Sequence, residues 1–170
     1  MGAEVAMEIA DILMPQSIVV QLSATSKKQA LQELAKRAAT VTGLKDRFIF
    51  DALLQRERLG TTGVGHGIAI PHGKLEGIDK LFGLFARLEK PVDFYAIDEQ
   101  PVDLLFLLLA PETAGANHLK ALTRVYRLLR NRTICDKIRG GPTTAICSTP
   151  SLRKETPATP LKRSLLKSSS

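Results

Sequence analysis

The sequence predicts an α/β fold in which helices flank a mixed β-sheet. A short β-branched run at residues 18–20 precedes two segments of helical periodicity. The longest apolar run, 104–110, is too short to cross a bilayer and fits a buried strand. Because strand signals form a group between two groups of helical signals, the helices are expected to cover one mixed sheet. The length of 170 residues favours a single domain with its own core.

Two helices are predicted in the first half of the chain. Ser26 with Gln29 forms a possible capping box, and apolar and alanine residues then recur at helical spacing. Gly43 is expected to end this first helix. Asp46 is expected to begin the second helix, which ends near Gly60.

Two longer strands are predicted at residues 81–88 and 102–109, with Pro91 and Pro101 bounding the loop between them. A third helix follows, for which Asn117 is the expected N-cap. Its expected buried stripe consists of Leu119, Leu122, Val125, Tyr126 and Leu129. Residues 133–139 are expected to form a short fourth helix.

The C-terminal part of the chain has a different composition. About half of residues 142–170 are Pro, Ser or Thr, which is typical of disordered segments. We therefore expect an N-terminal extension at 1–6, a domain at 7–140 and a low-complexity tail at 141–170. An altered reading frame near codon 140 would produce the same abrupt change.

Composition and charge exclude several classes of protein. The formal net charge of +7 is concentrated in the tail, no helix carries a basic stripe, and there is no Trp, so nucleic-acid binding is not expected. Cys135 and Cys147 fit no metal or disulfide framework. The acidic N-terminus is no signal peptide, so a cytoplasmic protein without membrane insertion is expected. No metal or organic cofactor is expected.

The chemistry is expected at a glycine-rich stretch, residues 60–74, where His72 has the features of a phosphoacceptor. Pro71 restricts both its own backbone and that of Ile70, so the chain enters His72 rigidly. Gly73 permits close approach of the backbone to a phosphoryl group. A lone histidine in such a turn is also compatible with a merely structural or solvated role.

Donors for a phosphoryl group are available on both sides of the preceding turn. Thr61, Thr62 and Gly63 offer hydroxyl and backbone donors, and Arg56 lies near the end of the preceding helix. Arg56 is equally suited to a helix-end salt bridge. The stretch is no P-loop, because no Gly-Lys-Ser/Thr follows the glycines, and no dinucleotide fingerprint, because it precedes a strand.

The order of these residues resembles the phosphorylation signature of mannitol/fructose-type IIA domains of the bacterial phosphotransferase system. The string consists of Arg56-Glu57, then residues 59–63, then residues 67–74. The resemblance continues through 96–111 and 117–119 and covers about Met7 to Arg139. It implies an EIIA type-2 domain in which His72 accepts the phosphoryl group. The start at residues 7–13 resembles the nitrogen-regulatory branch.

His118 matches the second histidine of the family. At the start of a helix the macrodipole disfavours a charged imidazole, so a neutral His118 could donate to a phosphoryl group on His72. The alternative is a surface histidine near a cap. His66 is interpreted as a variable loop residue.

The resemblance implies a regulatory phosphoacceptor that is served by an HPr-like phosphocarrier and read by regulatory target proteins, including potassium-transport regulators. Two alternatives are a fructose- or mannitol-type transport IIA that passes phosphate to a IIB partner, and a non-catalytic interaction module. The partner surface is expected around His72, where the turns offer Val64, Ile68, Ile70 and Leu75, although some of these must face the core and leave only a modest exposed patch. The sequence leaves the oligomeric state open.

Overall fold

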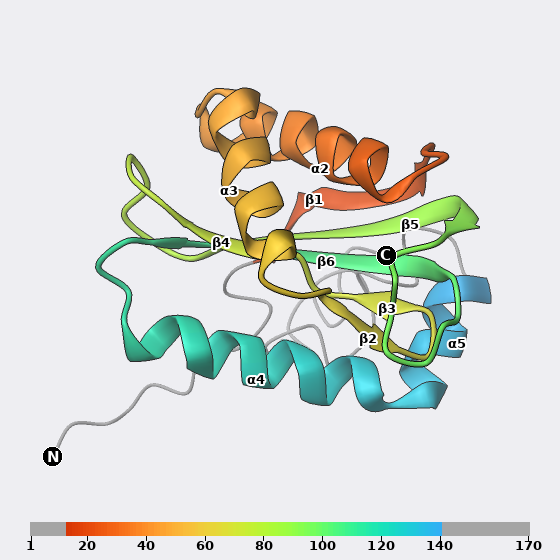
Figure 1. Cartoon of the computed structure of the whole chain (residues 1–170). Helices are drawn as coiled ribbons and strands as arrows, with labels where there is room; N and C mark the ends of the chain where they lie inside the picture. The colour runs from red at the N-terminus through yellow and green to blue at the C-terminus, as the bar shows by residue number, and fades with distance from the viewer. Residues whose placement is uncertain (1–12, 141–170) are drawn as a thin grey trace, which may run out of the picture.

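The computed structural model describes residues 13–140. Within them, a mixed six-stranded sheet is flanked by two helices on each face (Figure 1), as the sequence predicts. The expected N-terminal extension, 1–6, and the expected tail, 141–170, lie outside the described residues. None of the helices between residues 13 and 140 has the length and apolar character needed to span a membrane.

The elements follow one another in the predicted order. They are β1 (Leu13–Leu22), α2 (Lys27–Thr42), α3 (Asp46–Arg58), β2 (Gly63–Gly65), β3 (Ile68–Ala69), β4 (His72–Leu75), β5 (Phe82–Val92), β6 (Val102–Pro111), α4 (Ala116–Arg130) and α5 (Arg132–Gly140).

The long strands β5 and β6 form the centre of the sheet. The strand order is β1-β5-β6-β3-β2, and β4 also pairs with β6. β5 and β6 are antiparallel, whereas β1 is parallel to β5, and β3 and β4 are both parallel to β6. Residues 104–110 of β6 are completely buried, which explains the continuous apolar run in the sequence.

A break between β3 and β4 places His72 at the start of a new strand. The two short strands run along the same strand, β6, and are separated by Ile70 and Pro71. The backbone N–H of Ile70 donates to the carbonyl oxygen of Thr62 at 3.0 Å, outside the β6 ladder, and Pro71 has no N–H to donate. The Pro71 carbonyl accepts from Leu108 at 3.0 Å, so pairing with β6 resumes just before His72.

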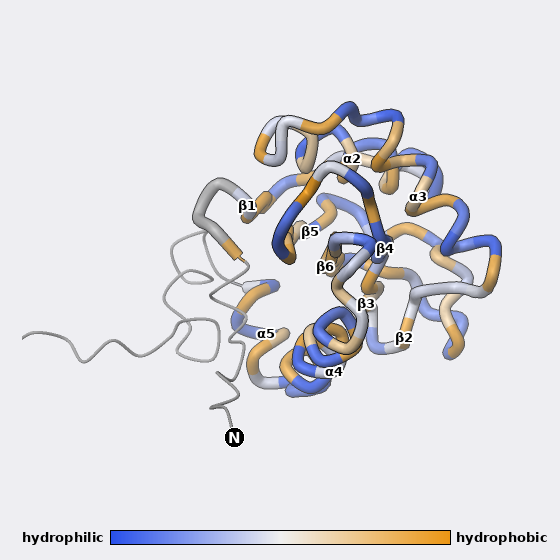
Figure 2. The backbone as a smooth tube through the Cα atoms, turned by 90° about the vertical axis from the view of Figure 1, so that its left-hand side faces the viewer, coloured by the Kyte–Doolittle hydropathy of each residue, from blue (hydrophilic) through white to orange (hydrophobic). Residues whose placement is uncertain are grey.

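Two apolar cores lie on opposite faces of the sheet (Figure 2). The larger one lies between the sheet and helices α2 and α3 and includes Leu34, Leu53 and Leu107. The smaller one joins the sheet to α4 and α5 and includes Phe106 and Val125. We refer to these as the α2–α3 layer and the α4–α5 layer.

The predicted ends of α2 are confirmed. The Ser26 side chain accepts a hydrogen bond from the Gln29 N–H at 3.1 Å, which satisfies one of the free donors of the first turn. The Gln29 side chain bonds to Thr25 in return, at 2.7 Å to its N–H, rather than to Ser26. Gly43 caps the C-terminus in a left-handed conformation with φ of 79°.

The expected N-cap of the third helix is wrong by two positions, and its expected buried stripe is right at Val125 and Leu129 but wrong at Leu119 and Tyr126. α4 begins at Ala116 with Gly115 as its N-cap, so Asn117 lies within the first turn. The buried residues are His118, Ala121, Val125, Leu128 and Leu129. Leu119 and Tyr126 are exposed instead. The expected and observed stripes share Val125 and Leu129 and both recur at helical spacing, and packing on β6 selects the one that begins at His118.

The expected loop boundary at Pro91 is also wrong. β5 continues through Pro91 to Val92, which pairs with Val102. The ladder between β5 and β6 shifts register between Arg87 and Val92. An irregular stretch of this kind tolerates a proline, because the missing N–H removes no ladder hydrogen bond there.

Candidate functional site

His72 lies at the first position of β4, and both of its ring nitrogens have partners. Nδ1 lies 2.9 Å from the carbonyl oxygen of Ile70. Because a carbonyl only accepts, Nδ1 carries the proton and Nε2 has the free electron pair. The side chain is half-buried. The restricted backbone at Pro71 and the Ile70 carbonyl together fix the tautomer that a nucleophilic Nε2 requires.

Arg56, in the last turn of α3, reaches the unprotonated ring nitrogen of His72. Its Nε–H donates to His72 Nε2 at 3.0 Å, and a second guanidinium nitrogen donates to the Gly60 carbonyl at 2.9 Å. The second bond holds the guanidinium beside the turn that follows α3. A planar cation with several donors is therefore in place where the oxygens of a group on Nε2 would lie.

His118 approaches His72 from the other face of the sheet, in the first turn of α4. The two ring centroids are 5.5 Å apart and the rings are tilted by 55°. His118 is only 7% exposed, and its Nε2 is buried without a hydrogen-bond partner among the described residues. A buried polar atom without a partner is unusual and makes His118 Nε2 a candidate for contact with a bound group.

Both histidines favour the neutral state. Burial lowers the pKa of His72 below the ordinary value of 6.5, and the Arg56 cation lowers it further, while the hydrogen bond to Ile70 and the charge of Glu57 act in the opposite direction. Burial also lowers the pKa of His118, with smaller contributions from His72 and Lys74. The pair therefore offers neutral imidazoles at pH 7.

The side-chain hydroxyls of the turn at residues 61–63 form hydrogen bonds to other parts of the fold and not to His72. The Thr61 hydroxyl donates to the Phe94 carbonyl at 2.7 Å and accepts from the Gly63 N–H at 3.0 Å. The Thr62 hydroxyl and N–H both donate to the Glu57 carboxylate. The donors that the sequence suggests for a phosphoryl group are thus already used inside the fold.

Two glycines pack closely around the site. A Cβ on Gly73 would lie 3.4 Å from the Cβ of Ala52, which is an ordinary packing distance, so Gly73 lies directly against α3 beside His72. A Cβ on Gly63 would lie 2.9 Å from the Cβ of Ala96, which is closer than side chains pack. Gly63 therefore lets the loop at 93–101 rest on the turn.

His66 stands apart from the two other histidines. It lies in the turn between β2 and β3 with a positive φ of 57°, and its N–H donates to the Asp98 carboxylate at 2.9 Å. No group of three or more possible metal ligands occurs within residues 13–140.

Three of the four apolar residues expected at the partner surface are buried. Ile68, Ile70 and Leu75 are at most 7% exposed. The strongly exposed apolar residues beside the site are instead Leu59, Ile97 and Leu119. Leu119 follows His118 directly, Leu59 precedes Gly60, whose carbonyl accepts from Arg56, and Ile97 follows Ala96, which packs on Gly63.

Sequence reasoning missed the pair formed by Lys27 and Glu57. Glu57 is buried and lies 2.6 Å from the Lys27 ammonium. Glu57 stands next to Arg56 in the sequence, which is a signal that could have been used. Lys27 is 30 residues away and carries no such signal.

The sequence matches a family model and several curated proteins. The model described as "Phosphoenolpyruvate-dependent sugar phosphotransferase system, EIIA 2" matches residues 11–148. A nitrogen regulatory protein of Bradyrhizobium diazoefficiens is 61% identical over 133 residues, 78% of this chain and 87% of the relative. One from Klebsiella oxytoca is 44% identical over 135 residues, 79% and 83% of the two chains. A fructose-specific EIIA component of Haloferax volcanii is 36% identical over 132 residues, 77% and 86%.

Solved structures show the same fold. Nitrogen regulatory protein IIA-Ntr from Neisseria meningitidis has a TM-score of 0.79 at 34% identity, with 85% of this chain and 99% of that chain covered. Mannitol IIA from Escherichia coli has a TM-score of 0.68 at 20% identity, covering 83% and 99%. A complex of mannitol IIA with phosphorylated IIB from the same organism gives 0.67 at 19%, covering 79% and 93%. This chain therefore belongs to the EIIA 2 family of the phosphoenolpyruvate-dependent sugar phosphotransferase system.

Proposed function

We propose that the protein is a nitrogen-regulatory IIA phosphoacceptor that receives a phosphoryl group on Nε2 of His72 from an HPr-like phosphocarrier. The observation that carries the proposal is the fixed tautomer of His72, with Nδ1–H on the Ile70 carbonyl and the free electron pair on Nε2 beside Arg56. The phosphorylation state would then be the output that regulatory target proteins read.

The transfer needs only groups that surround His72. The Nε2 electron pair attacks the phosphorus, a new N–P bond forms, and the N–P bond of the carrier breaks with its electron pair returning to the carrier nitrogen. The proton stays on Nδ1 of His72, where it is donated to the Ile70 carbonyl. Arg56 releases Nε2 and donates to the phosphoryl oxygens instead, which stabilises the charge that spreads over them.

His118 would complete the site from the opposite side. A neutral ring 5.5 Å from His72 is close enough for a donor nitrogen to reach an oxygen of a group on Nε2. That contact would give the buried Nε2 of His118 its partner. Because Thr61, Thr62 and Gly63 are bonded within the fold, we assign these residues, with Gly73, to shaping the site.

The regulatory role is favoured over sugar transport by the degree of similarity. The relative at 61% identity is a nitrogen regulatory protein, and the fructose-specific relative is at 36%. The transport alternative draws support from the mannitol IIA complex with phosphorylated IIB, which shares the fold. Possible targets include regulators of potassium transport.

The test is phosphotransfer from phosphoenolpyruvate through the first enzyme of the system and an HPr-like carrier. The wild-type protein should acquire one acid-labile phosphate, and His72→Ala should acquire none. His66→Ala, which changes a histidine outside the site, serves as the control and should be labelled normally. Full labelling of His72→Ala would refute the assignment. Rapid transfer onward to a IIB protein would favour the transport alternative.

A further inference from the structure

Glu57 is a buried carboxylate that organises the turn beside His72. It lies in the last turn of α3 and is 8% exposed. Its carboxylate accepts the Thr62 hydroxyl and the Thr62 N–H, the latter at 3.2 and 3.3 Å. A buried carboxylate with these donors holds the turn at one fixed distance from the helix that carries Arg56.

Lys27 completes the charge balance of Glu57 from a different helix. Its ammonium lies 2.6 Å from the carboxylate, and the side chains of Lys27 and Glu57 are 17% and 4% exposed. The same ammonium donates to the Phe94 carbonyl at 3.4 Å and lies 5.1 Å from the ring centroid of Phe94. The Phe94 carbonyl also accepts from Thr61. Lys27 thus joins α2, α3 and the loop at 93–101 at one point.

A continuous series of hydrogen bonds leads from this ion pair to the ring of His72. Thr62 donates to Glu57, and its carbonyl accepts the N–H of Ile70 at 3.0 Å. The Ile70 carbonyl accepts Nδ1–H of His72 at 2.9 Å. The position of the carbonyl that fixes the tautomer of His72 therefore depends on Thr62, and the position of Thr62 depends on Glu57.

Stability alone is a poor explanation of this arrangement. Removing two charges from water costs about as much as their attraction returns, and apolar residues of the same size often serve stability as well or better. The pair is connected to both partners of His72. Through Thr62 it reaches the Ile70 carbonyl, and through the backbone of α3 it adjoins Arg56.

We propose that Lys27 and Glu57 are positioning residues, which hold the Ile70 carbonyl and Arg56 at the geometry that makes Nε2 of His72 the nucleophile. This inference rests on the proposed phosphoacceptor function. Neither residue touches the reacting atoms. Both act through Thr62 and Ile70.

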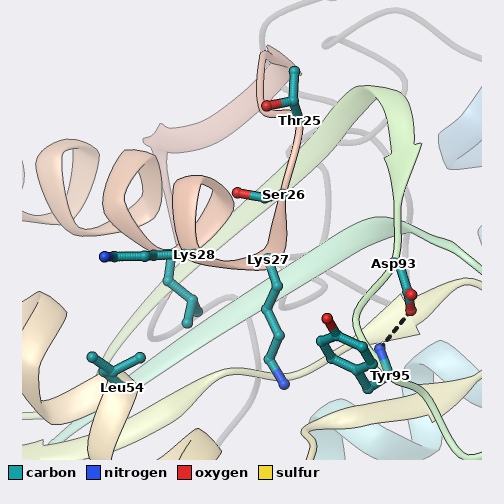
Figure 3. Close-up of a pocket in the computed structure, with 8 residues that line it drawn as sticks. Thr25, Ser26, Lys27, Lys28, Leu54, Asp93 and Tyr95 are labelled. Carbon is teal, nitrogen blue, oxygen red and sulfur yellow. Dashed lines mark hydrogen bonds between the residues drawn. The ribbon is translucent and has the colours of Figure 1, made fainter.

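Lys27 also faces an open pocket on the outer side of the network. The pocket, of about 440 Å³, is formed by the start of α2, Leu54 and the loop residues Asp93 and Tyr95. Figure 3 shows Lys27 extending from the start of α2 toward Tyr95, whose ring centroid is 5.5 Å from the ammonium. The pocket gives the ammonium end of the network contact with solvent, while the carboxylate end stays buried.

The test compares three variants of the full chain with wild type: Glu57→Gln, Lys27→Met and the double variant. Two quantities are measured, the kcat and KM of phosphotransfer from the HPr-like carrier, and the ¹⁵N NMR shifts of the His72 ring, which report its tautomer. The matched control is Glu33→Gln, which breaks the exposed pair of Glu33 and Lys36 in the same helix α2.

We expect Glu57→Gln to lower kcat at least about tenfold, with KM within about twofold, because misplacement of a reacting group slows the chemical step. The ¹⁵N shifts of His72 should show a loss of the pure Nδ1–H tautomer. The double variant should be less impaired than Lys27→Met alone, because Lys27→Met leaves a buried carboxylate unpaired. Glu33→Gln should match wild type in both measurements.

Unchanged kcat and unchanged His72 shifts in folded Glu57→Gln would overturn the inference. So would a loss of activity that follows the unfolded fraction alone. If Glu57→Gln does not fold, Thr62→Val takes its place, because it removes one donor and keeps the ion pair, and the same two outcomes decide. Failure of the proposed function is distinguishable, since wild type would then take no phosphate while the effect of Glu57 on the tautomer would still be measurable.

Discussion

The two helical layers contribute to the site in different ways. The α2–α3 layer supplies Arg56 already bonded to His72, together with a buried ion pair behind it. The α4–α5 layer supplies one residue, His118, whose buried Nε2 has no hydrogen-bond partner among the described residues. His72 lies between the two layers on β4.

This difference separates two tasks in phosphoryl transfer. The α2–α3 side is arranged before any phosphoryl group arrives, since Arg56, Glu57 and Lys27 already have partners. The α4–α5 side has an unused donor or acceptor, which would be used only when the group is present. Interactions that form only in the reacting complex accelerate the chemical step, and the proposed contacts of Arg56 and His118 with the phosphoryl oxygens are both of this kind. The difference is that Arg56 is already held beside His72 by other hydrogen bonds.

Of the substitutions considered, loss of Arg56 from the α2–α3 side should lower the rate of phosphotransfer most. In Arg56→Met the rate of phosphotransfer should fall by about 10³-fold, because a cation and two donors are lost at the oxygens of the transferred group. The pKa of His72 should rise, because the Arg56 cation lowers it in the wild type. Rapid-quench transfer kinetics and NMR titration measure the two effects. Arg58→Met, at an exposed position two residues away, should change neither.

Substituting His118 tests the other side. His118→Ala should lower the transfer rate by about 10²-fold through loss of one transition-state donor. The tautomer of His72 should not change, because His118 makes no hydrogen bond to the network that fixes it. Stopped-flow transfer and ¹⁵N NMR provide the measurements, with Asn117→Ala, at an exposed neighbour, as control. A shifted His72 tautomer in His118→Ala would contradict the proposed division of tasks.

Exposed apolar residues on both layers should contribute to docking of the carrier. Leu59 follows α3 and is 84% exposed, and Leu119 follows His118 and is 65% exposed. Leu59→Asp and Leu119→Asp should each raise KM about tenfold with little change in kcat, because they place a charge in an apolar contact. Phe48→Asp, at an exposed position about three turns earlier in α3, is the control. An effect at Leu119 alone would restrict docking to the α4–α5 layer.

Acidification should have the smallest effect, a decrease in the free energy of unfolding to which both His72 and His118 contribute. Burial lowers the pKa values of His72 and His118 below 6.5, so below that pH the unfolded chain binds more protons than the folded chain. The free energy of unfolding should therefore decrease as pH falls from 7.5 to 5.5. Urea unfolding at several pH values measures this decrease, and His72→Gln should reduce it. Stability that increases toward pH 5.5 would contradict the assigned directions.

Local signals in the sequence predicted most of the fold. The cap at Ser26, the left-handed end at Gly43 and the buried run in β6 each depend on residues that are close in sequence. The errors at α4 arose where two apolar faces compete, since Leu119 and His118 both fit a helical stripe. Packing against β6 decides between them, and no pattern within the helix encodes that choice.

The candidate site was predictable where its residues share one string. His72, Arg56 and the 61–63 turn lie within one stretch, and the structure brings His72 and Arg56 together. The hydrogen bonds from Thr62 to Glu57 were not predictable. The sequence contains several acidic residues near the turn, and nothing local distinguishes Glu57 as the one that accepts. Lys27 could not be found at all, since its contact with Glu57 exists only after α2 and α3 pack side by side.

The pairing of β4 with β6 limits how a signal could leave this protein. His72 is in register with Leu108, in the most deeply buried stretch of the sheet. Moving that backbone would disrupt a close-packed core on both faces, which is costly compared with the few kcal/mol of a typical switch. A phosphoryl group, in contrast, adds about two negative charges at once. A partner that distinguishes the two states would therefore detect a change of electrostatic potential on an otherwise constant surface.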